Sequence, residues 1–186
     1  MPVSVILAIG FVVSEGALAL TRRSARAGSP GPDRGSLLLL WAVNFVAVTL
    51  AFIFASGRSG YRLPSEIPWR LIGTGVFVAG TILRWWAIRH LGRFFSVDIA
   101  IAKDHRVIDD GPYRLVRHPS YTGLLMQFAG IGLVLGNLLS LLVIFLPTFL
   151  ALLYRIRLEE AALLSSLGES YAAYSRRTKR LVPWLF

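Results

Sequence analysis

Apolar residues in this chain are gathered into long runs with short polar segments between them. The first three runs are each long enough for an α-helix to cross a bilayer, and they cover residues 3–20, 37–55 and 69–88. A soluble domain has a comparable apolar share but does not concentrate it in runs of this length. With 55% hydrophobic residues in a chain of 186, the pattern predicts an all-α integral membrane protein.

The fourth apolar run, residues 121–154, is too long for one ordinary span. Gly136-Asn137 divides it, so we predict a tight helical hairpin with arms at 120–135 and 138–154, the second kinked by Pro147. Five spans result. A helix is expected to leave the membrane after the fifth, with Gly168 marking a break or the start of a second short helix, so that polar helices cover residues 155–180. The polar segments are too short to hold cores of their own, so the whole chain, 1–186, is expected to be a single domain.

Basic residues are unevenly distributed between the polar segments. Lys and Arg together number four in 21–36, two in 57–68, six in 89–117 and six in 155–180. Because cytoplasmic loops carry an excess of these residues, the N-terminus is expected outside and the C-terminus in the cytoplasm. We therefore attribute the net charge of +10 first to membrane topology and to contact with anionic lipid head groups, and not to nucleic-acid binding. The segment 21–36, with its Gly-Ser-Pro-Gly-Pro sequence, is expected to be flexible.

The spans contain few polar features. Glu15 is expected to face other helices or to lie near the interface, and Arg84 is expected to snorkel to the interface. Gly73, Gly75 and Gly80 would allow a close approach of another helix. The chain has no cysteine, which excludes disulfides and thiolate catalysis, and its three histidines lack metal-like spacing, so no metal site is expected.

The polar segment at 109–123, DDGPYRLVRHPSYTG, directly precedes the hairpin. Its Gly-Pro step predicts a turn, and His118-Pro119 predicts a helix that starts at the proline. A helix start offers unpaired backbone N–H groups that attract a carboxylate or phosphate. An ordinary juxtamembrane loop would have the same aromatic and basic residues, so these residues alone leave both interpretations open. Arg155 and Glu159 likewise share a helix face, either as a surface pair or as part of a site.

Three motifs carry a family resemblance. The sequence reads GPYRxVRHPSYxG at 111–123, RxxxEE at 155–160 and GExYxxY at 168–174, with the apolar hairpin between the first two. This combination resembles the isoprenylcysteine carboxyl methyltransferase family, and also the wider set of integral membrane methyltransferases that includes phospholipid N-methyltransferases. The resemblance covers residues 95–180 in detail, whereas the first three spans match only in being spans. It implies a five-span core with S-adenosylmethionine bound in a cytosolic pocket formed by residues 95–121 and the C-terminal helices.

The resemblance also implies roles for individual residues. It places Arg155 at the methyl acceptor, as the catalytic and substrate-binding residue, and Glu159 at the cofactor. The other residues that it places at the cofactor are His105, Arg106, Val107, Ile108, Tyr113, His118, Pro119, Ser120 and Tyr121. Asp98 stands where an amide or basic side chain would be expected, so its role is open. No obvious recognition element for a prenylated protein is present.

The chemistry of these side chains suits such a cofactor. Tyr113 and Tyr121 offer ring faces to a sulfonium, Glu159 offers a carboxylate to an ammonium or to ribose hydroxyls, and the helix start offers N–H groups to a carboxylate. Methyl transfer to a carboxylate converts a cation and an anion into neutral products, so a desolvated pocket favours it and no general base is required.

The most direct hypothesis is therefore methyl esterification of an isoprenylcysteine or a similar lipophilic molecule, with membrane lipids as further partners. Methylation of a lipid amine or thiol by the same fold is an alternative, but it needs a proton acceptor that the sequence does not offer. A nicotinamide-dependent membrane reductase is a further alternative, although the Gly-rich dinucleotide fingerprint is absent. A non-enzymatic small membrane protein is the fourth.

Overall fold

The computed structural model describes residues 2–21, 34–57, 61–63, 66–95 and 106–183. These residues form helices and connecting loops, with two isolated β-bridges and no β-strand among them. The elements in chain order are α1 Val3–Thr21, α2 Arg34–Ser56, α3 Glu66–Leu91, η1 Gly92–Phe94, η2 Gly111–Arg114, α4 Pro119–Val134, α5 Leu138–Leu167 and α6 Glu169–Arg177.

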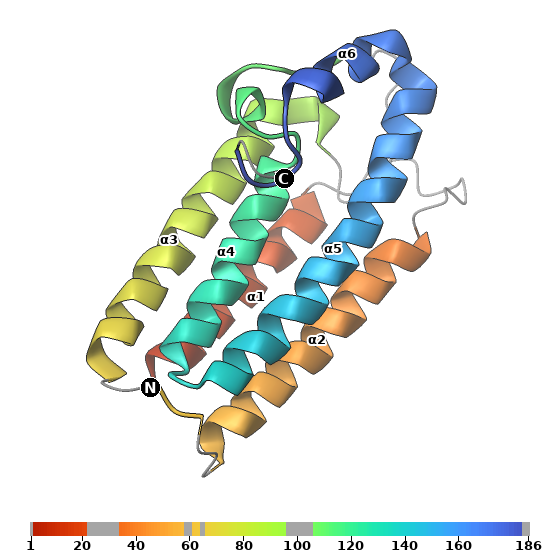
Figure 1. Ribbon diagram of the computed structural model, residues 1–186. Helices are drawn as coiled ribbons and strands as arrows, with labels where there is room; N and C mark the ends of the chain where they lie inside the picture. The colour runs from red at the N-terminus through yellow and green to blue at the C-terminus, as the bar shows by residue number, and fades with distance from the viewer. Residues whose placement is uncertain (1, 22–33, 58–60, 64–65, 96–105, 184–186) are drawn as a thin grey trace.

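The long helices run side by side with α4 surrounded by the others (Figure 1). Helices α1, α2 and α3 cover the first three predicted spans with a few residues added at their ends. Helix α2 begins at Arg34, so its first three residues, 34–36, belong to the segment 21–36 that we expected to be a linker. Residues 22–33 lie outside the described part of the chain, so the flexibility of that linker stays a prediction.

Four helices in the described residues are long and apolar enough to cross a membrane: α1, α2, α3 and α5. The predicted all-helical membrane architecture is therefore confirmed. Helix α4 has 16 residues, a length of about 24 Å, which is shorter than the bilayer core of about 30 Å. Most of its residues are buried against neighbouring helices.

Helices α4 and α5 form the predicted hairpin. Gly136 has a φ of +64°, which a residue with a side chain rarely adopts, and the Asn137 side chain accepts a hydrogen bond of 3.0 Å from the Ser140 N–H to cap α5. The predicted span end at residue 154 is not a helix end. Helix α5 continues to Leu167 because neither glycine nor proline follows Pro147 until Gly168, where the chain turns into α6.

Glycines set the distance between α3 and α4. A Cβ atom on Gly73 would lie 2.7 Å from the Gly130 carbonyl oxygen, and one on Gly80 would lie 2.6 Å from the Gly123 carbonyl oxygen. Both distances are too short for a side chain, so the two backbones touch. The predicted close approach is confirmed at Gly73 and Gly80. It is wrong at Gly75, where a Cβ atom would meet nothing within 4 Å.

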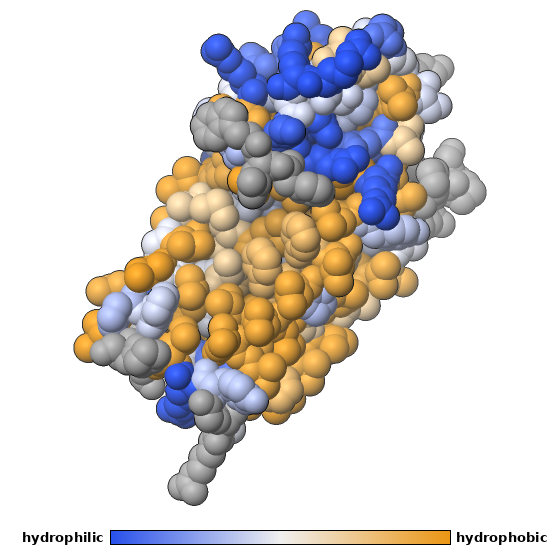
Figure 2. All heavy atoms as spheres, in the orientation of Figure 1, coloured by the Kyte–Doolittle hydropathy of each residue, from blue (hydrophilic) through white to orange (hydrophobic). Residues whose placement is uncertain are grey.

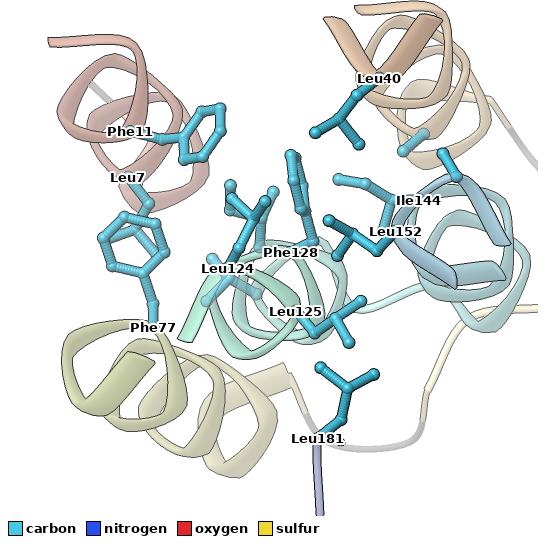
Figure 3. Close-up of a cluster of buried hydrophobic side chains, with 14 of the residues drawn as sticks. Leu7, Phe11, Leu40, Phe77, Leu124, Leu125, Phe128, Ile144, Leu152 and Leu181 are labelled. Carbon is cyan, nitrogen blue, oxygen red and sulfur yellow. The ribbon is translucent and has the colours of Figure 1, made fainter. Parts of the chain in front are cut away.

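The apolar core lies around α4. Phe128 and Leu124 point among side chains from the surrounding helices, and the rings of Phe128 and Phe11 of α1 are 4.8 Å apart between centroids (Figure 3). Outside this core, apolar side chains cover the long helices, whereas hydrophilic residues gather at the end that holds α6 (Figure 2). We call this end, formed by η2, α6 and residues 178–183, the polar end of the bundle.

Candidate active site

The hydroxyl group of Tyr121 joins two charged side chains near the polar end. Tyr121 lies in the first turn of α4, and Arg155 and Glu159 lie four residues apart on one face of α5. Arg155 Nε donates to the Tyr121 hydroxyl over 2.9 Å, and that hydroxyl donates to Glu159 Oε2 over 2.7 Å. The three residues, named here the Tyr121 cluster, are thus brought together from two elements.

Burial differs within the Tyr121 cluster. Arg155 is 3% exposed and also donates to the Ser36 hydroxyl over 3.1 Å, whereas the Glu159 side chain is 30% exposed. A buried guanidinium needs partners for its N–H groups, and Ser36 of α2 and Tyr121 of α4 are two of them. The cluster therefore has a fixed, buried cation and an accessible carboxylate side by side.

His118 extends the cluster on the α4 side. Its ring stacks on the Tyr121 ring, with centroids 5.6 Å apart and planes 14° from parallel. Its Nδ1 lies 3.9 Å from Glu159 Oε2, and its Nε2 lies 3.3 Å from Glu160 Oε1. The predicted site residues His118, Tyr121, Arg155 and Glu159 are therefore neighbours.

Glu160 binds the C-terminal segment, residues 178–183, next to this site through hydrogen bonds. Besides His118, it accepts hydrogen bonds from Arg117 Nε over 2.8 Å and from Arg180 Nη2 over 2.8 Å. Arg117 also donates to the carbonyl groups of Ser175 and Thr178. The sequence prediction missed this role of Glu160. An acidic residue next to Glu159, with basic motifs on both flanking segments, was the signal for it.

Tyr113 holds η2 against α3 and α6. Its buried hydroxyl donates to the Ala87 carbonyl over 3.3 Å, and its own carbonyl accepts from the Tyr174 hydroxyl over 2.7 Å. Burial raises the pKa of Tyr113 well above its ordinary value, and the nearby Glu159 carboxylate raises it further. Tyr113 therefore stays neutral and can serve as a ring face or a donor.

A cavity of about 50 Å³ opens beside Arg155, between the ends of the helices near the polar end. Tyr121 and Arg155 line it on one side. The apolar residues that line it are Phe11, Leu37, Leu40, Trp41, Phe95 and Leu124. The Arg155 guanidinium therefore lies between a cavity with both apolar and polar lining residues and the Glu159 carboxylate.

Glu15 and Arg84 also line this cavity. Arg84 Nε and Nη2 donate to the two Glu15 oxygens over 2.6 and 2.7 Å, and both residues are less than 10% exposed. The expectation that Glu15 faces other helices is confirmed, whereas the expectation that Arg84 snorkels is wrong. Opposite charges near the same end of two spans were a signal for this pair, because each is costly in lipid alone.

Comparison with known proteins identifies the family. The model of the isoprenylcysteine carboxyl methyltransferase (ICMT) family matches residues 71–165, which include Arg84, Tyr121, Arg155 and Glu159. This chain belongs to the ICMT family. The resemblance seen in its motifs is thereby confirmed, and the family's cofactor is S-adenosylmethionine, as the sequence predicts.

Several curated relatives carry the same family name. Protein-S-isoprenylcysteine O-methyltransferase of Schizosaccharomyces pombe is 37% identical over 111 residues, which are 59% of this chain and 47% of the relative. Protein-S-isoprenylcysteine O-methyltransferase B of Arabidopsis thaliana is 32% identical over 61% of this chain and 58% of its own length. This chain therefore spans about half the length of the curated relatives it matches.

The solved structure of a eukaryotic intramembrane Ras methyltransferase ICMT has the same fold. It superposes with a TM-score of 0.64 over 99% of this chain and 68% of that protein, at 21% sequence identity. Together with the candidate spans, this match shows a multi-pass membrane protein of the ICMT fold.

The start of α4 differs from our expectation for an ICMT-type anion site. The N–H groups of Tyr121 and Thr122 both donate to the His118 carbonyl, over 3.0 and 3.1 Å. Pro119 has no N–H, and His118, Pro119 and Ser120 are buried. The prediction of unpaired N–H groups at this helix start is therefore wrong for Tyr121, because the His118 carbonyl accepts its hydrogen bond.

Arg106, Val107 and Ile108, which were also expected to line the ICMT cofactor pocket, lie within the described residues. Arg106 is exposed, and Val107 and Ile108 are half-buried. Within the described residues, no hydrogen bond or ion pair joins these three to the cluster, so their role stays a prediction. His105 and Asp98 lie outside the described residues.

Proposed function

We propose that this protein transfers a methyl group from S-adenosylmethionine to the carboxylate of an isoprenylcysteine or a similar lipophilic molecule. The observation that carries the proposal is the position of Arg155, a buried cation between a cavity partly lined by apolar side chains and the Tyr121–Glu159 hydrogen bond. A guanidinium binds a carboxylate through two parallel hydrogen bonds. The apolar wall suits the prenyl chain attached to it.

The residues around Glu159 fit the cofactor. The half-exposed Glu159 carboxylate can accept hydrogen bonds from an ammonium group or from ribose hydroxyls, and Tyr121 and Tyr113 offer ring faces for a sulfonium. S-adenosylmethionine supplies, when bound, an electrophilic methyl group on cationic sulfur. Membership of the ICMT family supports this assignment.

Arg155 and Tyr121 provide the catalytic contribution. In the reaction a carbon–sulfur bond breaks and a carbon–oxygen bond forms to the acceptor carboxylate, which yields a thioether and a methyl ester without proton transfer. Arg155 holds the carboxylate in line for that transfer, and the Tyr121 hydroxyl fixes Arg155 relative to Glu159. Because opposite charges are neutralised, the burial of Arg155 favours the reaction by excluding water.

We also propose that α4 is the fifth span and that the polar end lies in the cytoplasm. Helix α4 alone is too short to cross the bilayer core. Because neighbouring helices bury most of its residues, it need not reach both lipid surfaces by itself. The positive-inside distribution of Lys and Arg supports a cytoplasmic polar end and an outside N-terminus. The whole chain, 1–186, then acts as one membrane domain.

Two variants test the proposed division of roles. Binding of S-adenosylmethionine to the detergent-purified protein is measured by calorimetry. We expect Glu159→Ala to weaken cofactor binding at least about tenfold, because a charge-assisted hydrogen bond is lost. Arg155→Ala is expected to retain binding but to lose transfer to S-farnesylcysteine. Glu169→Ala, at an exposed position of α6, is the matched control. Absence of binding to folded native protein would contradict the proposal.

A further inference from the structure

The buried ion pair of Glu15 and Arg84 has no part in the methyl transfer described above. It joins α1 to α3, because Arg84 Nε and Nη2 donate to the two Glu15 oxygens over 2.6 and 2.7 Å. Both residues lie within candidate membrane spans, where ionisable side chains are costly and are functional candidates by default. Apolar residues join two helices at lower cost, so joining α1 to α3 does not by itself account for the pair.

Arg84 also contacts the helix that carries Tyr121. Its Nη1 donates to the Ser120 carbonyl, in the first turn of α4, over 3.0 Å. A guanidinium is a planar and rigid fork of N–H donors, so the two hydrogen bonds to Glu15 fix the direction in which Nη1 points. Glu15 of α1 therefore orients Arg84 of α3, and Arg84 in turn holds a carbonyl group of α4.

The carbonyl that Arg84 holds belongs to the peptide group between Ser120 and Tyr121. The N–H of the same peptide group donates to the His118 carbonyl over 3.0 Å. Because a peptide group is planar, partners on both sides fix its orientation, and with it the direction in which the Tyr121 side chain leaves the backbone. The Tyr121 hydroxyl at the end of that side chain is the oxygen atom that hydrogen-bonds to both charged residues of the Tyr121 cluster.

We propose that Arg84 is a positioning residue for methyl transfer: held by Glu15, it fixes the Ser120–Tyr121 peptide group and thereby places the hydroxyl of the Tyr121 cluster. This inference rests on the proposed function and adds to it a residue that acts through Tyr121 without touching the substrate. A displacement of about 1 Å at a reacting centre can lower a rate about 100-fold. Loss of the Arg84 fork is therefore expected to show in kcat.

Arg84→Lys separates positioning from the mere joining of helices. Lysine keeps a positive charge beside Glu15, but its ammonium on a flexible stem lacks the rigid fork that reaches Glu15 and Ser120 together. With S-farnesylcysteine as the acceptor, we expect kcat and kcat/KM to fall together by at least about tenfold, with KM little changed. Ser14→Ala is the matched control, because the Ser14 hydroxyl accepts from Trp85 Nε1 over 2.9 Å, a neighbouring hydrogen bond between the same two helices. It should retain native kcat.

Combination with Tyr121→Phe tests whether Arg84 acts through the Tyr121 hydroxyl. When that hydroxyl is absent, Arg84 has no oxygen to position, so Arg84→Lys is expected to lower kcat by less than about twofold further. A general structural defect would lower kcat by the same factor with and without the hydroxyl, since independent effects multiply in the rate.

Hydrogen exchange in the cofactor-free protein gives a measurement that does not depend on activity. Arg84→Lys is expected to speed exchange of the Tyr121 and Thr122 amides, as for local opening of the first turn of α4, whereas Ser14→Ala should leave it native. The double variant Glu15→Gln/Arg84→Met removes both members of the pair and so leaves no buried charge without a partner. It takes the place of Arg84→Lys in all three measurements if the single variant does not fold, with the same expected results.

Three results would overturn the inference: native kcat in the folded variant, an equal loss of kcat with and without the Tyr121 hydroxyl, or unchanged exchange in the first turn of α4. No methylation of S-farnesylcysteine by native protein that binds S-adenosylmethionine would instead overturn the proposed function, and the inference with it. The two failures are distinguishable, because the first three results are read against an active native protein.

Discussion

Tyr121 shows at the scale of one residue how the site is assembled. Its hydroxyl accepts from Arg155 and donates to Glu159, so one oxygen atom couples the proposed acceptor-binding cation to the proposed cofactor-binding anion. Both hydrogen bonds involve a charged group, and such hydrogen bonds are stronger than those between two neutral groups. We infer that the hydroxyl sets the relative position of the two binding groups.

Replacing Tyr121 by phenylalanine removes this oxygen and keeps the ring that stacks on His118. We expect kcat/KM for methyl transfer to fall about 10- to 100-fold, because hydrogen bonds to charged groups contribute about 1.5–3 kcal/mol. Steady-state kinetics check this. Tyr154→Phe, at a 49% exposed position of α5, is the control and should retain native kinetics. Equal activity of the two variants would refute the coupling role.

The residues of the site differ in how far the sequence predicts them. Tyr121, Arg155 and Glu159 lie in motifs of the ICMT family, and the structure brings them together. Glu15 was expected to face other helices or to lie near the interface, and Arg84 was expected to snorkel. Their pairing was not expected, because it depends on how α1 and α3 pack, which neither span encodes alone. Glu160 was passed over for the same reason, since its partners come from two segments distant in sequence.

At the scale of elements, contact between α3 and α4 fixes the position of the Tyr121 cluster. A Cβ atom on Gly123, two residues after Tyr121, would lie 2.6 Å from the Gly80 carbonyl oxygen and 2.8 Å from the Arg84 backbone nitrogen. These are backbone atoms, which cannot move aside as a flexible side chain does. The first turn of α4 therefore sits against α3 without freedom to shift.

Gly123→Ala is accordingly expected to destabilise the protein by about 1–3 kcal/mol through overpacking. Thermal unfolding in detergent measures the effect. Gly75→Ala is a matched control on α3, because its Cβ would meet nothing within 4 Å. That change should be neutral or stabilising by up to about 1 kcal/mol, from the higher helix propensity of alanine. Comparable loss in both variants would contradict the close-packing account.

The C-terminal segment, residues 178–183, is held in place by hydrogen bonds from other parts of the chain. Glu160 receives hydrogen bonds from Arg117, His118 and Arg180, and the N–H groups of Arg117 and His118 donate to the carbonyls of Lys179 and Arg180. These hydrogen bonds attach the C-terminal segment both to α5 and to the residues just before α4.

Glu160→Gln should loosen this attachment, because an amide cannot accept all three donors as an anion does. We expect faster hydrogen exchange in α6 and residues 178–183, with α3 and α4 unchanged, as for local opening. Glu169→Gln is the control, since its ion pair with Arg176 is exposed and worth little. Unchanged exchange in Glu160→Gln would show that the network does not hold the segment.

Element boundaries were predictable where local signals mark them. The turn at Gly136-Asn137 and the break at Gly168 were both expected and are both observed, since a left-handed glycine and an Asn cap encode them locally. The polar helix after residue 154 was also expected. It is continuous with the apolar arm, so that both form α5, because a helix does not end where hydropathy changes.

At the scale of the whole molecule, the proposed topology places the polar end in the cytoplasm. The chain has no cysteine, so a single introduced cysteine is the only thiol of this chain that a reagent can label, and its labelling reports the side of the membrane on which it lies. Tyr61→Cys lies at the opposite end and is 60% exposed, and Ser165→Cys lies in the exposed last turns of α5. In intact cells we expect an impermeant thiol reagent to label Tyr61→Cys, and to label Ser165→Cys only after permeabilisation. The reverse pattern would invert the proposed orientation.

The most direct test of the central claim is the chemical form of the transferred methyl group. The purified protein is incubated with S-farnesylcysteine and S-adenosylmethionine labelled in its methyl group, and the product is treated with alkali. Alkali releases methanol from a methyl ester but not from a methylated amine or thiol. We predict volatile label after alkali, lost in Arg155→Ala. Alkali-stable label, or no transfer by protein that binds the cofactor, would contradict carboxyl methylation.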